Sequence, residues 1–468
     1  MFFSILKTFF STFGAPVFVP VIIFIIALCL KVKPKKAFVS ALSAAVGLMG
    51  FFLLINAYAP IITPIINGMV QDTGVNLPVF DVGWQTTSIV AYSTEVGMMF
   101  VAIAIILQTV LFLTRYVNVF QPGDLWNNYS YFVWGSMVYL ITNSIWLSLG
   151  CMVMQLLYTV MCAEVIEKRW STYYQYPNCT LASLHTVTNG PYAVIMEYIM
   201  NKFGLYKLHS DPSTLQKNLG FIGEPMTLGL FLGLLIGIIG QFHGLGELAT
   251  WGKIATCGVA TSAVMAVFPK VSAIFAGSFT AITEASKKSL QGVSGNGREW
   301  YLSVNDATGY GETATLISGI IMMPILLLIS FILPGNQTLP MIDLVALPYL
   351  IQPIVAMANG NVIKTVISGL IWFTMTLFVC SYTAPQFSQV VGVVGINLTT
   401  GAALVTSLVI LGQPVAMLIY LPFVWQSYPL IAVVVIVYII CYLLMRKYRP
   451  ALHAFMEKQA MMNVKDDD

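Results

Sequence analysis

Charged residues are scarce in this 468-residue chain: Asp, Glu, Lys and Arg together make up only 9% of it. In a soluble domain about one residue in four is charged. Apolar residues reach 58%, and the mean hydropathy is +0.83. This composition excludes an ordinary soluble domain and predicts a membrane protein. Each acidic residue or histidine inside an apolar stretch is then a candidate functional group, because polar groups are costly in lipid.

Motifs for catalysis and metal binding are also missing. The seven cysteines are scattered and form no Cys-x-x-Cys pair, and the chain has only four histidines. No HExxH, Walker lysine loop or GxSxG sequence occurs, which argues against a metalloprotease, ATPase or esterase site. No patch of basic and aromatic residues indicates nucleic-acid binding. We therefore expect no metal, no cofactor and no nucleic-acid partner.

Long apolar runs, in contrast, are abundant. Several approach the roughly 20 residues that a helix needs to cross a bilayer. Hydropathy indicates about ten to twelve membrane segments. The predicted fold class is therefore an all-α polytopic membrane protein embedded in the lipid bilayer. The clearest runs are Val17–Leu30, Ala37–Leu54, Val96–Leu113, Met226–Ile239, Leu316–Leu333, Val362–Cys380 and Pro429–Met445.

Loop charges predict the orientation of these segments, because Lys and Arg concentrate in cytoplasmic loops. Lys31–Lys36, Arg115 and Glu167–Arg169 are all expected on the cytoplasmic side. The apolar stretch Phe132–Cys162 would then begin and end on the same side. It should cross the membrane twice or fold back.

The end of the chain is expected to differ from the rest. After the basic cluster at Arg446–Arg449, the sequence turns polar and closes on Lys465–Asp468. Such a composition favours disorder. We predict one integral membrane unit over residues 1–450 and a cytoplasmic tail over 451–468.

Two apolar stretches are interrupted in ways that predict re-entrant hairpins. Leu181–Met200 is broken by Gly190–Pro191, and Asn397–Pro422 is broken by Gly412–Gln413–Pro414. Non-helical backbone at membrane depth persists only where protein or water shields it, and transporters bind substrate at such breaks. Gly223–Glu224–Pro225 resembles the second break and lies in the opposite half, which hints at an internal duplication.

Asp81 and Trp84 are the first candidate site residues. A carboxylate accepts hydrogen bonds from the hydroxyls of a polyol or sugar, and an indole covers its C–H face. The alternative is that Asp81 caps a following helix. The sequence leaves both interpretations open.

Glu95, His185 and Glu224 are further candidates. Glu95 lies inside an apolar stretch, where a carboxylate must be paired, protonated or in contact with water. His185 lies in the first broken stretch and exchanges hydrogen-bond roles near neutral pH. Glu224 precedes an apolar run, where it either complements the helix N-terminus or binds ligand hydroxyls.

Asp306 and Glu312 flank a glycine-rich bend that leads into the run near Ala314. Two carboxylates beside a flexible turn suit hydroxyl binding or proton acceptance. The alternative is a solvated loop that caps the next helix. Spacing alone does not decide between them.

Taken together, these motifs resemble the enzyme IIC component of the galactitol family of the phosphoenolpyruvate-dependent phosphotransferase system. Gly-Glu-Pro and Pro-Gly-Asn-Gln are the most specific elements, and the order of the motifs matches from near residue 10 to near residue 450. The residues that carry the resemblance are Asp81–Trp84, Leu113–Arg115, Asp124–Asn127, Gly223–Thr227 and Pro334–Pro340.

This resemblance implies a homodimeric permease in the bacterial cytoplasmic membrane. It implies a scaffold domain and a core domain with re-entrant hairpins, which carries the substrate inward by an elevator-like displacement. A separate IIB component, phosphorylated on cysteine and recharged by IIA, would then phosphorylate the substrate. The chain would be the membrane-embedded, substrate-binding component of that phosphotransferase complex.

The resemblance also suggests roles for single residues. Asp81, His185, Glu224 and Asp306 would bind hydroxyls, and Asp306 would accept the hydroxyl proton during phosphoryl transfer. Familiar members have histidine in place of Glu312 and an amide near Glu95, so this chain is expected to differ in specificity.

Another class of transporter stays open from the sequence. A proton- or sodium-coupled secondary transporter of a polyol or sugar could use Glu95, Glu224 and Glu312 as ion sites. An intramembrane enzyme is disfavoured, because no serine or cysteine has a neighbouring base.

Overall fold

The computed structural model describes residues 17, 20–21, 24–25, 27–28, 31–73, 77–81, 83–84, 87, 90–91, 94–121, 125–208, 225–278, 299–340, 342–393 and 404–464. Helices dominate this part of the chain, and four of them, α7, α15, α18 and α21, are long and apolar enough to cross a membrane. The predicted helical membrane class is confirmed, whereas ten to twelve segments stays a prediction.

The described helices are α3 (Pro34–Thr73), α5 (Glu95–Leu113), α6 (Leu125–Thr142), α7 (Ile145–Tyr173), α8 (Leu184–Val187), α9 (Gly190–Lys202), η1 (Leu205–Lys207), α11 (Pro225–Gly240), η3 (Phe242–Gly244), α12 (Leu248–Gly277), α14 (Ala307–Tyr310), α15 (Thr313–Ile332), η4 (Ile342–Ala346), α16 (Leu347–Leu350), α17 (Gln352–Met357), α18 (Val362–Val393), α19 (Leu408–Leu411), α20 (Pro414–Val424) and α21 (Tyr428–Met461).

Two short parallel sheets, which the sequence did not reveal, connect distant parts of the chain. Their strands have only two or three residues, too few for an alternating pattern to be visible. The strands are β1 (Val79–Asp81), β2 (Val119–Phe120), β3 (Cys179–Thr180), β4 (Tyr301–Ser303), β5 (Thr338–Leu339) and β6 (Leu404–Thr406), and the sheet orders are β5-β1-β6 and β2-β4-β3.

The order of these elements reveals an internal duplication. Two runs of elements share a common order: β1, α5, β2, α7, β3, α8 and α9 in the first part of the chain, and β4, α15, β5, α18, β6, α19 and α20 in the second. Helix α6 in the first run, and α14, η4, α16 and α17 in the second, are additional to this common order among the described elements. The first strand of each half lies between two strands of the other half. In this repeat Gly412–Gln413–Pro414 corresponds to Asn189–Gly190–Pro191. The sequence suggested the element at 223–225 as a counterpart, and that correspondence stays a prediction. Gly223 and Glu224 lie outside the described residues.

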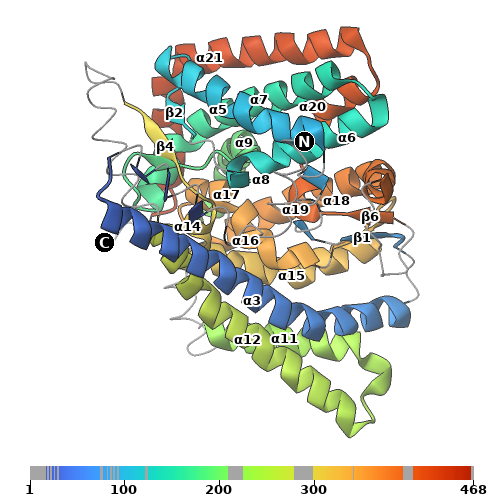
Figure 1. Cartoon of the computed structure of the whole chain (residues 1–468). Helices are drawn as coiled ribbons and strands as arrows, with labels where there is room; N and C mark the ends of the chain where they lie inside the picture. Colours follow the sequence, from blue (N-terminus) through green and yellow to red (C-terminus); the bar gives the residue numbers. More distant parts are fainter. Residues whose placement is uncertain are drawn as a thin grey trace.

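The helices are arranged in layers (Figure 1). Helices α3, α11 and α12 pack against one another along one side, while α5, α6, α7, α20 and α21 lie on the opposite side. The duplicated short helices and α15 lie between these layers. The main apolar core fills the region between α5–α7 and α15–α21. The breaks in the helices therefore lie inside the protein.

The packing of α11 against α12 depends on glycine. A Cβ added at Gly233 would lie 2.7 Å from the Cys257 carbonyl oxygen and 2.8 Å from the Cα of Gly258. Small residues let membrane helices approach this closely, and dispersion then holds them together.

We expect Gly233→Ala to destabilise the protein by about 1–3 kcal/mol, because the methyl group must force the two backbones apart. Gly252→Ala on α12 is the matched control, since its Cβ meets nothing within 4 Å. That variant should gain stability slightly, because alanine favours helix by about 1 kcal/mol over glycine. Thermal unfolding in detergent measures both variants. Equal melting temperatures would contradict the close contact.

The stretch Phe132–Cys162 reverses direction, which agrees with the prediction that it crosses the membrane twice or folds back. Helices α6 and α7 are joined by a turn at Asn143–Ser144 and pack along each other. Asn143 adopts the left-handed conformation with φ of 55°, and the Ser144 side chain caps α7 by accepting from the Leu147 N–H.

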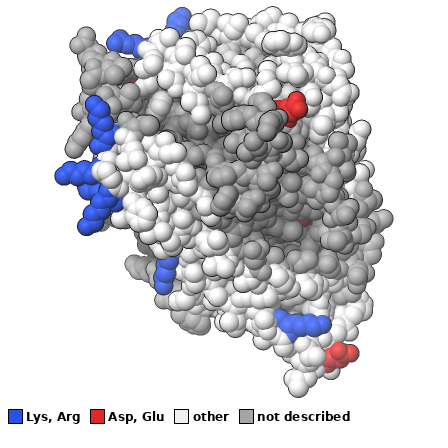
Figure 2. Space-filling model, in the orientation of Figure 1, with Lys and Arg blue, Asp and Glu red and all other residues white. Residues whose placement is uncertain are grey.

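Two groups of residues that the sequence placed on the cytoplasmic side can be located in the structure. Figure 2 shows Lys and Arg along the edge where α3 begins, and Lys31, Lys33, Lys35 and Lys36 are exposed there. Arg446 donates to the Arg115 carbonyl oxygen at 3.0 Å, which places the middle of α21 beside the C-terminal end of α5.

The expectation of disorder after Arg446 is wrong for residues 447–461, whereas residues 465–468 lie outside the described residues. Helix α21 continues to Met461, and His453, Met456 and Gln459 are buried. Arg449 pairs with the fully buried Glu167 of α7. The polar residues whose composition suggested disorder instead form ion pairs and hydrogen bonds with buried charged residues of other helices.

Candidate functional site

Three broken helical segments converge inside the protein. Helix α8 gives way to α9 at Thr188–Asn189, α16 to α17 at Ile351, and α19 to α20 at Gly412–Gln413. Each following helix has proline in its first turn. Proline lacks the N–H that would continue the preceding helix, and it favours the start of a new one. The sequence thus fixes the breaks locally.

Polar side chains at these breaks bind one another. The Thr188 hydroxyl donates to Gln413 Oε1 at 3.3 Å, and Asn189 Nδ2 donates to the Leu350 carbonyl oxygen at 2.6 Å. Thr188, Asn189 and Gln413 are all buried. The breaks of the two halves therefore meet.

The centre of this region is a buried pair formed by His185 of α8 and Asp306, which precedes α14. His185 Nε2 lies 2.8 Å from Asp306 Oδ2, and the side chains are 2% and 1% exposed. His185 Nδ1 lies 2.8 Å from Ser130 Oγ of α6. Because the carboxylate accepts, Nε2 carries a proton, and a neutral ring would accept from Ser130 at Nδ1. The sequence predicted both residues separately, and the structure brings them together.

Gln352, at the start of α17, holds Asp306 in place. Its Nε2 donates to the Asp306 carbonyl oxygen, and its Oε1 accepts from Trp170 Nε1 of α7 at 3.2 Å. A Cβ at Gly309 would lie 2.2 Å from Gln352 Oε1, so a side chain at this position would displace the Gln352 amide from its contacts.

An aromatic wall extends from the histidine. The Tyr129 ring centroid lies 5.8 Å from that of His185 and 6.5 Å from that of Trp84. Tyr129 therefore connects Trp84 with the His185–Asp306 pair. The Trp84 indole is a candidate surface for the C–H face of a carbohydrate.

Asp81 has a different environment. Its Oδ2 accepts from the Asp343 N–H at 2.8 Å, and its Oδ1 accepts from the Gly83 N–H at 3.1 Å and the Leu408 N–H at 3.4 Å. It is 0% exposed. The carboxylate thus accepts from the backbone at Gly83, in η4 and at the start of α19, which is a capping role toward segments that lie mostly far from Asp81 in the sequence. The predicted cap of the helix that directly follows Asp81 stays a prediction.

Asp343 reciprocates. Its Oδ1 accepts from the Trp84 N–H at 2.9 Å, and its Oδ2 accepts from the Ser407 hydroxyl at 2.6 Å and the Val409 N–H at 3.0 Å. Burial raises the pKa of the Asp343 carboxyl, while these hydrogen bonds oppose the rise. The two aspartates lock β1, η4 and α19 together.

The remaining candidates lie at helix ends. Glu312 caps α15: its carboxylate accepts from the Ala314 N–H at 3.0 Å and the Thr315 N–H at 2.8 Å. Glu95 is exposed in the first turn of α5, where a negative charge complements the helix dipole. Glu224 lies outside the described residues.

Sequence reasoning missed Ser130, Tyr129, Gln352 and Asp343, and it used Gln413 only as part of a break. A signal existed for Gln352 and Gln413, because each directly precedes a proline. An amide directly before a helix-starting proline lies at a break and is available for side-chain hydrogen bonds.

Broken helices that converge on a buried polar pair, inside an apolar helical body, define a membrane transporter. The particular family follows from comparison with known proteins. The profile of the PTS system sugar-specific permease component, EIIC-GAT, matches residues 8–401. The chain belongs to this family, which makes it a membrane permease component that acts on a sugar substrate together with IIB and IIA.

Two relatives from Escherichia coli (strain K12) illustrate the similarity. The PTS system galactitol-specific EIIC component is 27% identical over 417 residues, which cover 89% of this chain and 90% of the relative. A putative permease IIC component is 27% identical over 379 residues, which cover 80% of this chain and 84% of the relative.

Proposed function

We propose that this permease carries a galactitol-like polyol or sugar across the bacterial cytoplasmic membrane, and that the substrate binds at the His185–Asp306 pair. The observation that supports this most strongly is the pair itself, buried where the helix breaks converge. The printed name of the galactitol-specific relative supports the substrate class.

The chemistry of the site suits a polyhydroxylated substrate. Each hydroxyl both donates and accepts hydrogen bonds, so it needs carboxylate, imidazole and amide partners within a small volume. Asp306, His185 and Gln413 supply these groups, and Tyr129 with Trp84 supplies the aromatic face. Glu312 and Glu95 act at helix N-termini in this proposal, and Asp81 acts through the backbone rather than on the substrate.

Phosphoryl transfer requires a destination for one proton. The substrate hydroxyl oxygen forms a bond to phosphorus, the bond between the IIB cysteine sulfur and phosphorus breaks, and the cysteine leaves as thiolate. The hydroxyl proton passes to the Asp306 carboxylate. His185, hydrogen-bonded to that carboxylate, orients it. The broken segments would act as re-entrant hairpins of a core that moves past a scaffold in a homodimer.

Transport in proteoliposomes tests the proposal. We expect a labelled polyol from a panel that includes galactitol to accumulate, as its phosphate, only with phosphorylated IIB on the cytoplasmic side. A proton or sodium gradient alone should produce no accumulation above that of empty liposomes. Accumulation of unmodified polyol under a gradient would instead establish the ion-coupled alternative and refute phosphoryl-coupled transport.

A further inference from the structure

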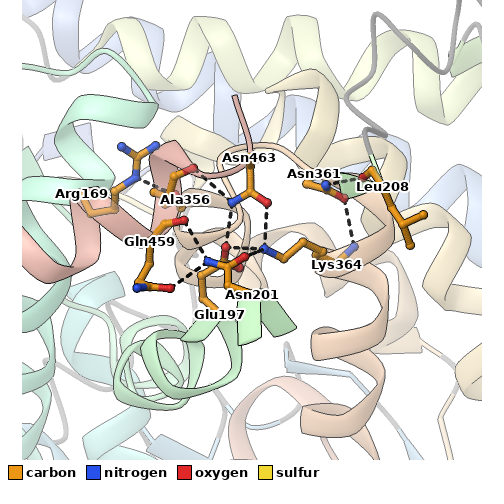
Figure 3. Close-up of polar contacts among 10 residues, drawn as sticks. Arg169, Glu197, Asn201, Leu208, Ala356, Asn361, Lys364, Gln459 and Asn463 are labelled. Carbon is orange, nitrogen blue, oxygen red and sulfur yellow. Dashed lines mark hydrogen bonds and ion pairs between the residues drawn. The ribbon is translucent and has the colours of Figure 1, made fainter. Parts of the chain in front are cut away.

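The C-terminal segment, residues 457–463, inserts polar side chains among buried charges of other helices. Figure 3 shows the cluster that results, with Lys364 of α18 at its centre. Lys364 is 0% exposed and Glu197 of α9 is 1% exposed. Charges this deeply buried need hydrogen-bond partners, because desolvating them costs several kcal/mol each.

Asn463 completes the partners of Lys364. The lysine Nζ donates to Glu197 Oε1 at 2.5 Å, to Asn201 Oδ1 at 2.6 Å and to Asn463 Oδ1 at 2.8 Å. These three contacts use all three ammonium protons. Asn463 Nδ2 also donates to Glu197 Oε1 at 2.7 Å. A single carboxamide from the end of the chain thus bridges both members of the ion pair.

Gln459 fixes the same end of α9. Asn201 Nδ2 lies 3.0 Å from the Gln459 carbonyl oxygen and 2.9 Å from its Oε1, and donates to both. The C-terminal end of α9 is therefore held from α18 on one side and from the C-terminal segment on the other.

Glu457 acts on α17 through Arg169. Arg169 Nη1 donates to Glu457 Oε2 at 2.8 Å, while its Nε donates to the Ala356 carbonyl oxygen at 2.7 Å near the end of α17. A further nitrogen, Nη2, donates to Asn359 Oδ1. The guanidinium is 3% exposed, so its position depends on these partners.

Both helices held in this way begin at the candidate site. Helix α9 follows Asn189, which donates to the Leu350 carbonyl oxygen, and α17 starts at Gln352, which donates to the Asp306 carbonyl oxygen. At a rise of about 1.5 Å per residue, α17 is roughly 9 Å long and α9 roughly 20 Å long. Helices this short transmit a displacement of one end to the other.

We propose that residues 457–463 are a positioning element of the substrate site. They complete the hydrogen bonds of Lys364 and Arg169, and so fix the far ends of α9 and α17, whose near ends carry Asn189 and Gln352. The role assigned to the site rests on the proposed function, whereas the mechanical coupling does not.

Hydrogen–deuterium exchange of the full-length protein in detergent tests the coupling without any ligand. We expect Asn463→Ala to accelerate exchange about three- to tenfold at residues 184–193 and 350–354, as well as at 197–202. Lys458→Ala is the matched control: this exposed lysine lies on the same segment, and its loss should leave exchange at the site unchanged. Faster exchange confined to 197–202 and 457–463 would overturn the proposal.

A charge rearrangement supplies a second test that separates positioning from general destabilisation. Asn463→Asp places a carboxylate beside Glu197 and should accelerate exchange at 184–193 more than Asn463→Ala does. The Asn463→Asp/Glu197→Gln double variant again has one carboxylate, now at position 463, and one amide, now at position 197, around the Lys364 ammonium. Exchange in this double variant should therefore return to the wild-type rate. Failure of the double variant to recover, with the single variants folded, would contradict the coupling.

Binding of a labelled polyol adds the functional readout. Glu457→Ala is expected to weaken binding about three- to tenfold while the melting temperature falls by less than in Gly233→Ala. If exchange changes but no polyol binds even to the wild-type protein, the proposed substrate fails and the coupling stands. If the polyol binds equally to the wild-type and Glu457→Ala proteins, and exchange at residues 350–354 is the same in both, the coupling fails.

Discussion

His185→Ala is expected to weaken polyol binding by at least about 30-fold and to abolish phosphoryl-coupled uptake. The substitution leaves the Asp306 carboxylate, 1% exposed, without its imidazole partner. Removing one member of a buried hydrogen-bonded pair costs about 2–5 kcal/mol. Asp306→Asn keeps the shape of the side chain but removes the proton acceptor, so it should retain measurable binding while phosphorylation is lost.

Binding of labelled galactitol and related polyols to purified protein, together with uptake in proteoliposomes, measures these effects. His243→Ala is the control, because this exposed histidine lies in η3. In the His185→Ala/Asp306→Asn double variant the losses should not add, since both side chains belong to one interaction. Additive losses, or wild-type affinity in His185→Ala, would remove the pair from the site.

Asp81→Asn is expected to lower the free energy of unfolding by about 2–4 kcal/mol, with affinity in the folded fraction changed much less. The three backbone N–H groups of Gly83, Leu408 and Asp343 converge on the Asp81 carboxylate. Asparagine offers one acceptor oxygen and turns its NH₂ group toward a donor. Asp343→Asn should have a similar effect, because it caps Trp84 and Val409 in return.

Thermal unfolding in detergent and polyol titration of the same samples distinguish the two roles of Asp81. Glu95→Gln serves as the comparison: its exposed carboxylate only complements a helix N-terminus, an effect of about 0.3–1 kcal/mol. An Asp81→Asn protein that melts at the wild-type temperature but no longer binds polyol would show that Asp81 contacts substrate, as its surroundings in the sequence first suggested.

Local signals were sufficient for the helix breaks. Gly190–Pro191 and Gly412–Gln413–Pro414 interrupt helices because proline and glycine act on their immediate neighbours, and the structure has breaks at both places. The fold-back between α6 and α7 followed from loop charges on either side. Composition and motif order were also enough to indicate the permease family that the comparison confirmed.

Contacts between residues that lie far apart in the sequence could not be predicted from such local signals. His185 and Asp306 are 121 positions apart, and Asp343 donates to Asp81 across 262 positions. The sequence around an aspartate such as Asp81 looks the same whether its carboxylate binds a sugar or caps another segment. The choice depends on which backbone N–H groups the fold brings to it.

The sequence by itself determined the apolar environment, the positions of the breaks and the family, because each depends on composition or on neighbouring residues. Only the tertiary structure decided that His185 meets Asp306 and that Asp81 and Asp343 lock each other. It also decided that the C-terminal segment from Arg449 to Asn463 provides partners for Glu167, Arg169 and Lys364. Buried polar groups must find partners wherever the chain brings them, and in this protein those partners lie on helices far apart in the sequence.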